Sequence, residues 1–146
     1  MDYASTFAIS AAGMALERTR VEVAALNVAN AHTTPQPGQA PYSPVRVLAL
    51  PASEASFAAL MLGGDSSAAA LSPEFRVENA PVLPRMVHEP GHPMADAKGF
   101  VSYPGVDVAA EMVSLMSATR AYEANVAAMN TARTLALKAL EIGGGS

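Results

Sequence analysis

The sequence predicts a mainly α-helical protein, with long N- and C-terminal helices paired as a coiled coil and a small, irregular, β-rich middle region. The first observation is proline placement, because all 11 prolines lie between positions 35 and 104. Proline removes an amide donor and clashes inside a helix, so only the two ends can form long helices. The second observation is that apolar residues recur at helical spacing in both proline-free ends. The predicted parts are an N-terminal helix at 1–34, a middle region at 35–104, a C-terminal helix at 105–142 and a short tail at 143–146.

The composition excludes several classes of function. Of the 146 residues, 51% are apolar and 15% are charged, which indicates a folded chain and not a disordered one. The net charge of −4 offers no basic surface for nucleic acid. Because the chain has no cysteine, it has no disulfide, no catalytic thiol and no cysteine-based zinc site. Alanine accounts for 31 of the 146 residues, so we expect the elements to pack at short range.

The N-terminal helix is predicted to begin near Ser5 or Thr6, whose hydroxyls can cap the first free amides. It should end between residues 30 and 34, because Pro35 disfavours helical geometry in the residue before it. Two apolar stripes run along this helix, and a helix that is apolar on two sides needs more than one neighbour. The stripes are Phe7, Met14, Val21 and Val28, and Ile9, Leu16 and Val23.

The C-terminal helix carries the strongest periodic signal. Asp107 and Glu111 stand near its start, where the helix dipole favours carboxylates. At 1.5 Å per residue, a helix over 107–141 would be about 52 Å long and would project from a domain of this size. The free energy gained from the helical hydrogen bonds and from burying one apolar stripe only offsets the conformational entropy lost when this helix forms. The stripe therefore needs a partner, which is the N-terminal helix, other copies of the chain or other proteins. The predicted coiled-coil seam is Val108, Met112, Leu115, Thr119, Tyr122, Val126, Met129, Arg133, Ala136 and Leu140.

The middle region is predicted to hold short strands between its prolines. Its first part, 35–44, should be extended, because four of these ten residues are proline. Residues 52–72 should form a loop with one helical turn at 57–62. The expected strands are 45–50, 75–77, 83–87 and 100–103.

One segment has the spelling of a catalytic motif. His88-Glu89-Pro90-Gly91-His92 follows the H-E-x-x-H order of zinc peptidases, in which both histidines lie on one helical face and the glutamate is the base. Pro90 and Gly91 prevent that helix, so we favour a structural turn over a zinc hydrolase that uses His88, Glu89 and His92. The sequence therefore predicts no catalytic residue, no metal and no cofactor.

Asn27 and Asn30 are polar residues near the end of the first helix. A ligand site is the alternative, but asparagine at a helix end more often bonds backbone groups and holds the exit of the chain. We include both among the residues expected to pack or to contact other subunits. That set is Phe7, Met14, Val21, Asn27, Val28, Asn30, Val108, Met112, Leu115, Tyr122, Val126, Met129 and Leu140.

Two further blocks have a distinctive order of residues. Residues 26–34 read LNVANAHTT and are followed by QAPY at 39–42, while residues 89–101 read EPGHPMADAKGFV. The first block resembles the helix-end motif of the flagellar rod and hook family of axial proteins. The second block, with Pro104 after it, resembles the proximal-rod subunits of that family more closely. The similarity continues into the C-terminal helix through YEAN at 122–125.

The resemblance covers roughly residues 7–50 and 82–142, whereas residues 52–81 resemble nothing that we can place. His88 and Met94 stand where the family commonly has a tyrosine and a second acid, which concerns only the detail of that loop.

The resemblance implies a structural protein without enzymatic activity. In the family, the terminal helices pair into an inner coiled-coil domain that packs against neighbouring subunits in a helical tube, and the middle forms a small outer domain. A proximal-rod subunit is a building block of the drive shaft for flagellum-dependent motility, within the bacterial cell envelope, in the periplasm. A different rod or hook subunit is the alternative.

The resemblance also implies partners and a route of export. The expected partners are rod subunits of the FlgB, FlgF and FlgG types, the rod-base junction protein of the FliE type, and further copies of the chain. Family members travel unfolded through the flagellar type III export apparatus, and no basic residue precedes Arg18, so we expect no cleaved signal. We expect no nucleic acid partner and no membrane span. The tail at 143–146 differs from the family's ending, and we expect it to be an addition.

Overall fold

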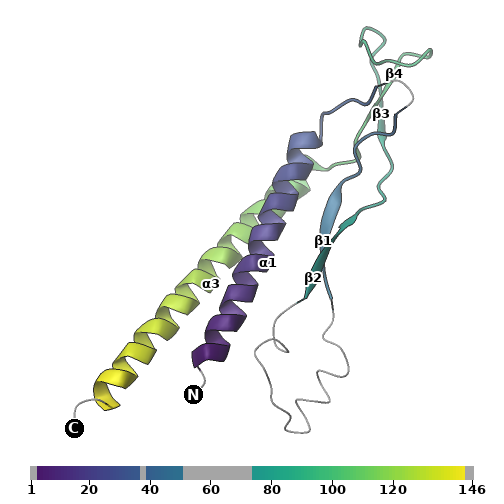
Figure 1. Cartoon of the computed structure of the whole chain (residues 1–146). Coiled ribbons are helices and arrows are strands. Elements are labelled where there is room, and N and C mark those ends of the chain that lie inside the picture. The colour runs from purple at the N-terminus through teal and green to yellow at the C-terminus, as the bar shows by residue number, and fades with distance from the viewer. Residues whose placement is uncertain (1–2, 37–38, 51–73, 144–146) are drawn as a thin grey trace. The chain divides into compact units, whose positions relative to one another are not determined.

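The computed structural model describes residues 3–36, 39–50 and 74–143, and these residues form two long helices and four short strands (Figure 1). This is the mainly helical fold with a β-rich middle that the sequence predicts. No helix among the described residues is long and apolar enough to cross a membrane. In chain order the elements are α1 (Tyr3–Asn30), β1 (Val45–Ala49), β2 (Phe75–Asn79), β3 (Arg85–His88), β4 (Phe100–Tyr103) and α3 (Val108–Gly143).

The predicted elements agree closely with these bounds. Each of the four strands begins and ends within two residues of its predicted position. The predicted helical turn at 57–62 lies outside the described residues. The start of α1 differs from the prediction, because the helix already includes Tyr3 and therefore begins before Ser5 and Thr6. At the start of α3, the Asp107 carboxylate accepts hydrogen bonds from the backbone N–H groups of Ala109 and Ala110, at 3.0 and 3.2 Å, and so caps the helix.

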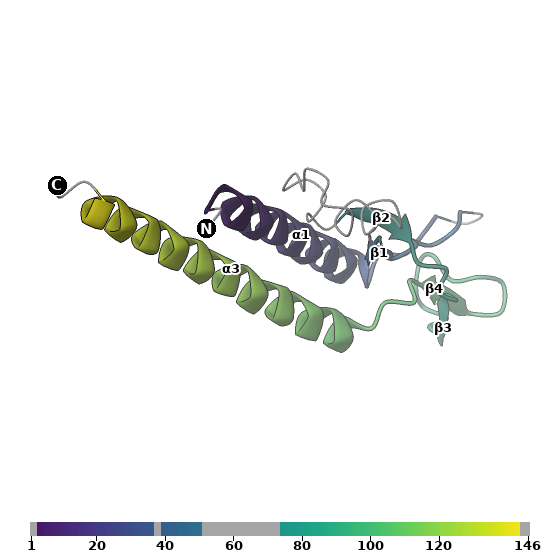
Figure 2. The ribbon, with the colours of Figure 1, turned by 90° about the horizontal axis from the view of Figure 1, so that it is seen from below.

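The chain divides into two compact units, each of which contains part of both helices. The first unit comprises Met1–Thr19, Ala49–Arg76 and Ser117–Ser146, and the second comprises Arg20–Leu48 and Val77–Met116. Within each unit, a part of α1 lies beside a part of α3, as the views of Figure 1 and Figure 2 show from two directions.

Small and polar side chains, not the large apolar stripes, are the most buried residues of the two helices. In the first unit, Gly13 of α1 lies so close to Asn125 of α3 that a Cβ on this glycine would be 3.0 Å from the Asn125 amide. Such close approach requires small residues. The buried residues of α1 are Ser10, Glu17, Ala24 and Asn27, and those of α3 are Ala118 and Ala132.

The four strands form two small sheets. β1 and β2 pair with each other, and the N–H groups of Ala80 and Leu50 donate to the carbonyls of Pro44 and Glu74 at the two ends of this pair, so the strands are antiparallel. β3 and β4 pair antiparallel, from Arg85 opposite Tyr103 to His88 opposite Phe100. In the second unit, the largest fully buried side chains are Val101, Asn27 and Pro104.

Gly105 lies too close to the segment before β3 to accept a methyl group. A Cβ at this position would clash with the Leu83 carbonyl oxygen and would lie 2.6 Å from Val82 Cγ1. We expect Gly105→Ala to lower the free energy of unfolding by about 1–3 kcal/mol. Gly91→Ala is the matched control, because its Cβ would meet nothing within 4 Å. Urea unfolding followed by tyrosine fluorescence tests this expectation, and equal midpoints for the two variants would contradict it.

Candidate assembly site

Asn27 joins three separate parts of the second unit. Its side-chain amide donates to the Val45 carbonyl at 2.8 Å and to Glu111 Oε1 at 2.9 Å. Its Oδ1 accepts from the Tyr42 hydroxyl at 2.9 Å and from the Val45 N–H at 3.0 Å. The side chain is 1% exposed, and all of its hydrogen-bonding capacity is used within the chain. Asn27 therefore fixes the start of β1 and the first turn of α3 to the end of α1.

Tyr42 and Glu111 complete this polar cluster. Burial raises the pKa of the Tyr42 hydroxyl, and the negative charge of Glu111 raises it further. The hydroxyl therefore stays protonated and keeps its role as the donor to Asn27 at neutral pH.

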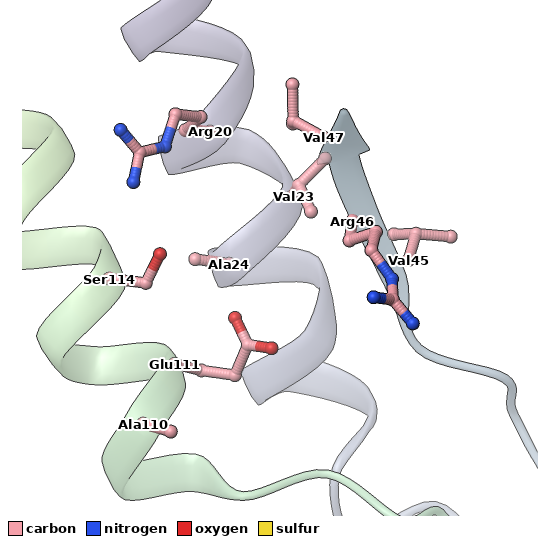
Figure 3. A pocket seen from close by; sticks show the side chains of 9 residues that line it. All are labelled: Arg20, Val23, Ala24, Val45, Arg46, Val47, Ala110, Glu111 and Ser114. Atoms are coloured by element: carbon pink, nitrogen blue, oxygen red, sulfur yellow. The ribbon is translucent and has the colours of Figure 1, made fainter. Parts of the chain in front are cut away.

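A pocket of about 230 Å³ lies next to this cluster, between α1, β1 and α3. Figure 3 shows that Arg20 and Ala24 of α1 face Ser114 and Glu111 of α3, while the Arg46 side chain lies along β1. In this view α1 descends from Arg20 to Ala24, whereas α3 rises from Glu111 to Ser114. The two helices therefore run antiparallel here.

Asn30 has a smaller, local role. Its amide donates to the Leu26 carbonyl at 2.8 Å, one turn back in the same helix, and the Asn30 carbonyl accepts from Thr33 N–H and Oγ1. The two asparagines therefore both bond backbone groups, as the sequence favours, but only Asn27 ties distant parts of the chain together. The sequence shows neither the Tyr42 nor the Glu111 contact, because these partners are 15 and 84 residues away.

Large apolar side chains remain uncovered along α3. Met112, Val113 and Met116 are 56%, 66% and 53% exposed, and their spacing of three and four residues puts them on one face. We call them the outer patch, because Glu111 and Ser114, which face α1, lie on the other side of the helix. A second group near the end of α3, which we call the terminal patch, is Leu135, Leu137, Leu140 and Ile142.

The residues predicted to pack fall into three groups. Asn27 is buried, whereas Met112, Tyr122 and Leu140 of the predicted seam are exposed, so the described part of the chain leaves them largely uncovered. Thr119 and Arg133 of the seam are exposed as well. The half-buried group is Phe7, Met14, Val21, Val28, Asn30, Val108, Leu115, Val126 and Met129.

The segment 88–92, which has the residue order of the zinc-peptidase motif, is the end of a strand followed by a turn. His88 closes β3 and packs edge-on against Phe100 of β4, with ring centroids 5.0 Å apart. His92 Nδ1 accepts a hydrogen bond from the Met94 N–H at 3.1 Å, and Glu89 accepts one from the Tyr103 hydroxyl at 3.1 Å. Within residues 3–36, 39–50 and 74–143, no cluster of three metal-binding side chains occurs.

Asp96 holds the turn between β3 and β4. Its carboxylate accepts the N–H groups of Lys98 and Phe100, each at 2.8 Å, and Gly99 follows with a φ of 79°, which glycine adopts without strain. These hydrogen bonds from Phe100 and Lys98 hold the pKa of the Asp96 carboxyl below its ordinary value of 3.8.

The lowered pKa of Asp96 makes the turn sensitive to acid. Because folding favours the carboxylate, the stabilising contribution is complete above pH 3.8 and is lost as the pH falls through the lowered pKa. We expect the Lys98 and Phe100 amides to stay protected from hydrogen exchange above pH 3.8 and to lose protection below it. Asp96→Asn should remove this pH dependence. Protection that persists unchanged into strong acid would contradict the assignment.

These features define a class of protein, a helical structural subunit whose terminal helices leave apolar surface open to neighbouring chains. Comparison with known proteins gives the family. Residues 97–142 match the family described as "Flagellar basal body rod FlgEFG protein C-terminal".

Relatives that span nearly the whole chain are more specific. The chain is 38% identical over 137 residues to the flagellar basal-body rod protein FlgC of Escherichia coli O6:H1. This alignment covers 94% of this chain and 95% of the relative. It is 34% identical over 143 residues to FlgC of Yersinia enterocolitica, covering 98% and 99% of the two chains. It is also 34% identical over 141 residues to FlgC of Bacillus subtilis, covering 92% and 94%. The chain belongs to the FlgC family and is a structural subunit of the flagellar basal-body rod.

Proposed function

We propose that this chain is a proximal-rod subunit that polymerises through its terminal helices, as part of the drive shaft for motility. The observation that carries the proposal is the outer patch, Met112, Val113 and Met116, which is more than half exposed although its helix is packed on the opposite side. Large apolar residues gathered on one helix face mark a contact surface for other chains. The terminal patch adds further exposed apolar side chains near the end of α3.

The partners that we propose are other rod subunits of the FlgB, FlgF and FlgG types, a junction protein of the FliE type at the rod base, and further copies of the chain. The location that we propose is the periplasmic part of the basal body, reached through the type III export apparatus. What supports these details is the membership of the FlgC family together with the open apolar faces of α3.

Far-UV circular dichroism of the purified full chain tests the polymerisation proposal. Helices with uncovered apolar faces gain much of their stability from packing, so we expect the chain alone to be less helical than the assembled subunit and its helicity to rise clearly on mixing with purified rod subunits. High, cooperative helicity in the chain alone, with no change on mixing, would contradict assembly through the helices.

We also propose that the chain performs no chemistry. The support is that Glu89, the base of the zinc-hydrolase alternative, lies after the end of a strand and bonds Tyr103. Glu89→Gln removes a general base but keeps an acceptor for the Tyr103 hydroxyl. A strain that carries only this variant should swim as the parent does, and loss of motility at a normal protein level would contradict a purely structural role.

A further inference from the structure

A second pocket lies in the second unit, beside the β3–β4 hairpin. Its volume is about 230 Å³, and its apolar lining includes Pro35, Met86, Met94 and Phe100. Met86 pairs with Ser102 and His88 with Phe100, so Met86 and Phe100 lie on the same face of the hairpin. The side chains of Met86, Met94 and Phe100 are 55%, 36% and 37% exposed, so this apolar part of the pocket is open to solvent.

The same unit presents an apolar side chain on a fixed segment. Leu83 is 88% exposed, more than any other large apolar residue among those that the structure describes. It stands between Val82 and Pro84 in a segment whose carbonyl at Leu83 lies tightly against Gly105. Proline and this close backbone contact restrict the segment before any partner binds, and such preorganisation lowers the entropy lost on association.

The charges beside these two features are opposite. Arg85, two residues after Leu83, stacks over the Tyr103 ring at 5.6 Å and has no carboxylate partner within the described part of the chain. Asp96 lines the pocket, and its carboxylate accepts two backbone N–H groups. Since an ionised carboxylate can accept about four hydrogen bonds, it retains capacity for a guanidinium.

We propose that the pocket binds Leu83 of a second copy of the chain, with Arg85 of that copy against Asp96. The two surfaces differ, so the contact is head-to-tail. A pair of copies keeps a free pocket on one copy and a free Leu83 on the other. A head-to-tail contact that does not close into a ring generates an open filament. The inference rests on the proposed function and deepens it, because it names a second copy as one neighbour within the rod.

Cysteine cross-linking of the full chain tests this contact, and the natural absence of cysteine makes it clean. We expect the double variant Leu83→Cys, Met94→Cys to form a ladder of dimers, trimers and longer products under oxidation with copper phenanthroline. A disulfide requires Cα atoms within about 7 Å, so the ladder reports direct contact. Leu83→Cys with Gln39→Cys, on another lining residue, guards against a folding defect in the first pair.

Matched controls separate this contact from random collision. Each single cysteine variant, and Leu83→Cys combined with Ala109→Cys on exposed α3 surface, should stay monomeric. Adding Arg85→Glu to the double variant should lower the ladder about tenfold, because it replaces an attraction by a repulsion.

Three results would overturn the proposal. The first is the absence of a ladder from both cysteine pairs. The second is a dimer from Leu83→Cys alone, because it would indicate a symmetric contact. The third is a ladder that Arg85→Glu leaves unchanged. Circular dichroism of the unmodified chain mixed with rod subunits distinguishes a failure of this contact from a failure of the proposed function. If helicity still rises on mixing, the proposed function stands while this contact fails.

Discussion

Replacing Asn27 by leucine should abolish rod assembly and motility. The change removes all four hydrogen bonds of a side chain that is 1% exposed. It leaves the N–H and carbonyl of Val45 and one oxygen of Glu111, all part-buried, without their partner. Each buried polar group left unpaired costs about 1–3 kcal/mol. The sum is a large part of the roughly 5–15 kcal/mol by which a domain is stable.

Complementation of a motility-deficient strain measures this effect, with immunoblots to compare protein levels. Asn27→Asp is the sharper variant, because it keeps the volume and the acceptor for Tyr42 but loses both donors and puts a second negative charge beside Glu111. We expect it to be as defective as the leucine variant. Asn30→Ala is the control, since Asn30 bonds only within its own helix end, and should retain motility. Normal swimming with Asn27→Leu would contradict the role of this cluster.

The elements of the fold could be predicted because their signals are local. Proline, whose effect on the backbone does not depend on distant residues, confines long helices to the two ends. The short apolar runs between prolines give the four strands within two residues. The spelling from His88 to His92 is interpreted correctly as non-helical for the same local reason, since Pro90 and Gly91 stand inside it.

The residues that pack the helices against each other could not be predicted from side-chain size. The predicted seam consists of large apolar positions such as Met112 and Leu140, yet both are exposed, while Ala118 is fully buried. Alanine and glycine let two helices approach closely, so the larger side chains are displaced to the flanks and the outer face. The spacing of seven from Ser10 to Glu17 and on to Ala24 is the signal that could have found this stripe.

The hydrogen bonds of the Asn27 cluster could not be predicted from the sequence for a different reason. A helix-end asparagine has many local partners, and the sequence does not show which one it takes. Its actual partners depend on how β1 and α3 pass the end of α1, which is a tertiary property. A polar residue with partners so far along the chain is therefore visible only in three dimensions.

Replacing Met112 by aspartate should block assembly while the chain itself keeps the structure that it has alone. The side chain is 56% exposed, so a carboxylate there stays in water in the free subunit. At a contact with a neighbour, the same carboxylate would be buried without a partner, which costs several kcal/mol and weakens association by more than about a hundredfold. Leu115→Asp and Val126→Asp should also abolish assembly, but both residues are half-buried, so those changes disturb the chain as well.

Asn130→Asp is the matched control for Met112→Asp, because it adds the same charge at an exposed position of the same helix, about four helical turns beyond the outer patch. Circular dichroism of each variant alone should equal that of the unmodified chain. On mixing with rod subunits, only Asn130→Asp should gain helicity, and only Asn130→Asp should restore motility. If Met112→Asp assembles and swims normally, the outer patch is not a contact surface, and the terminal patch around Leu140 becomes the part of α3 that must bear the contact between subunits.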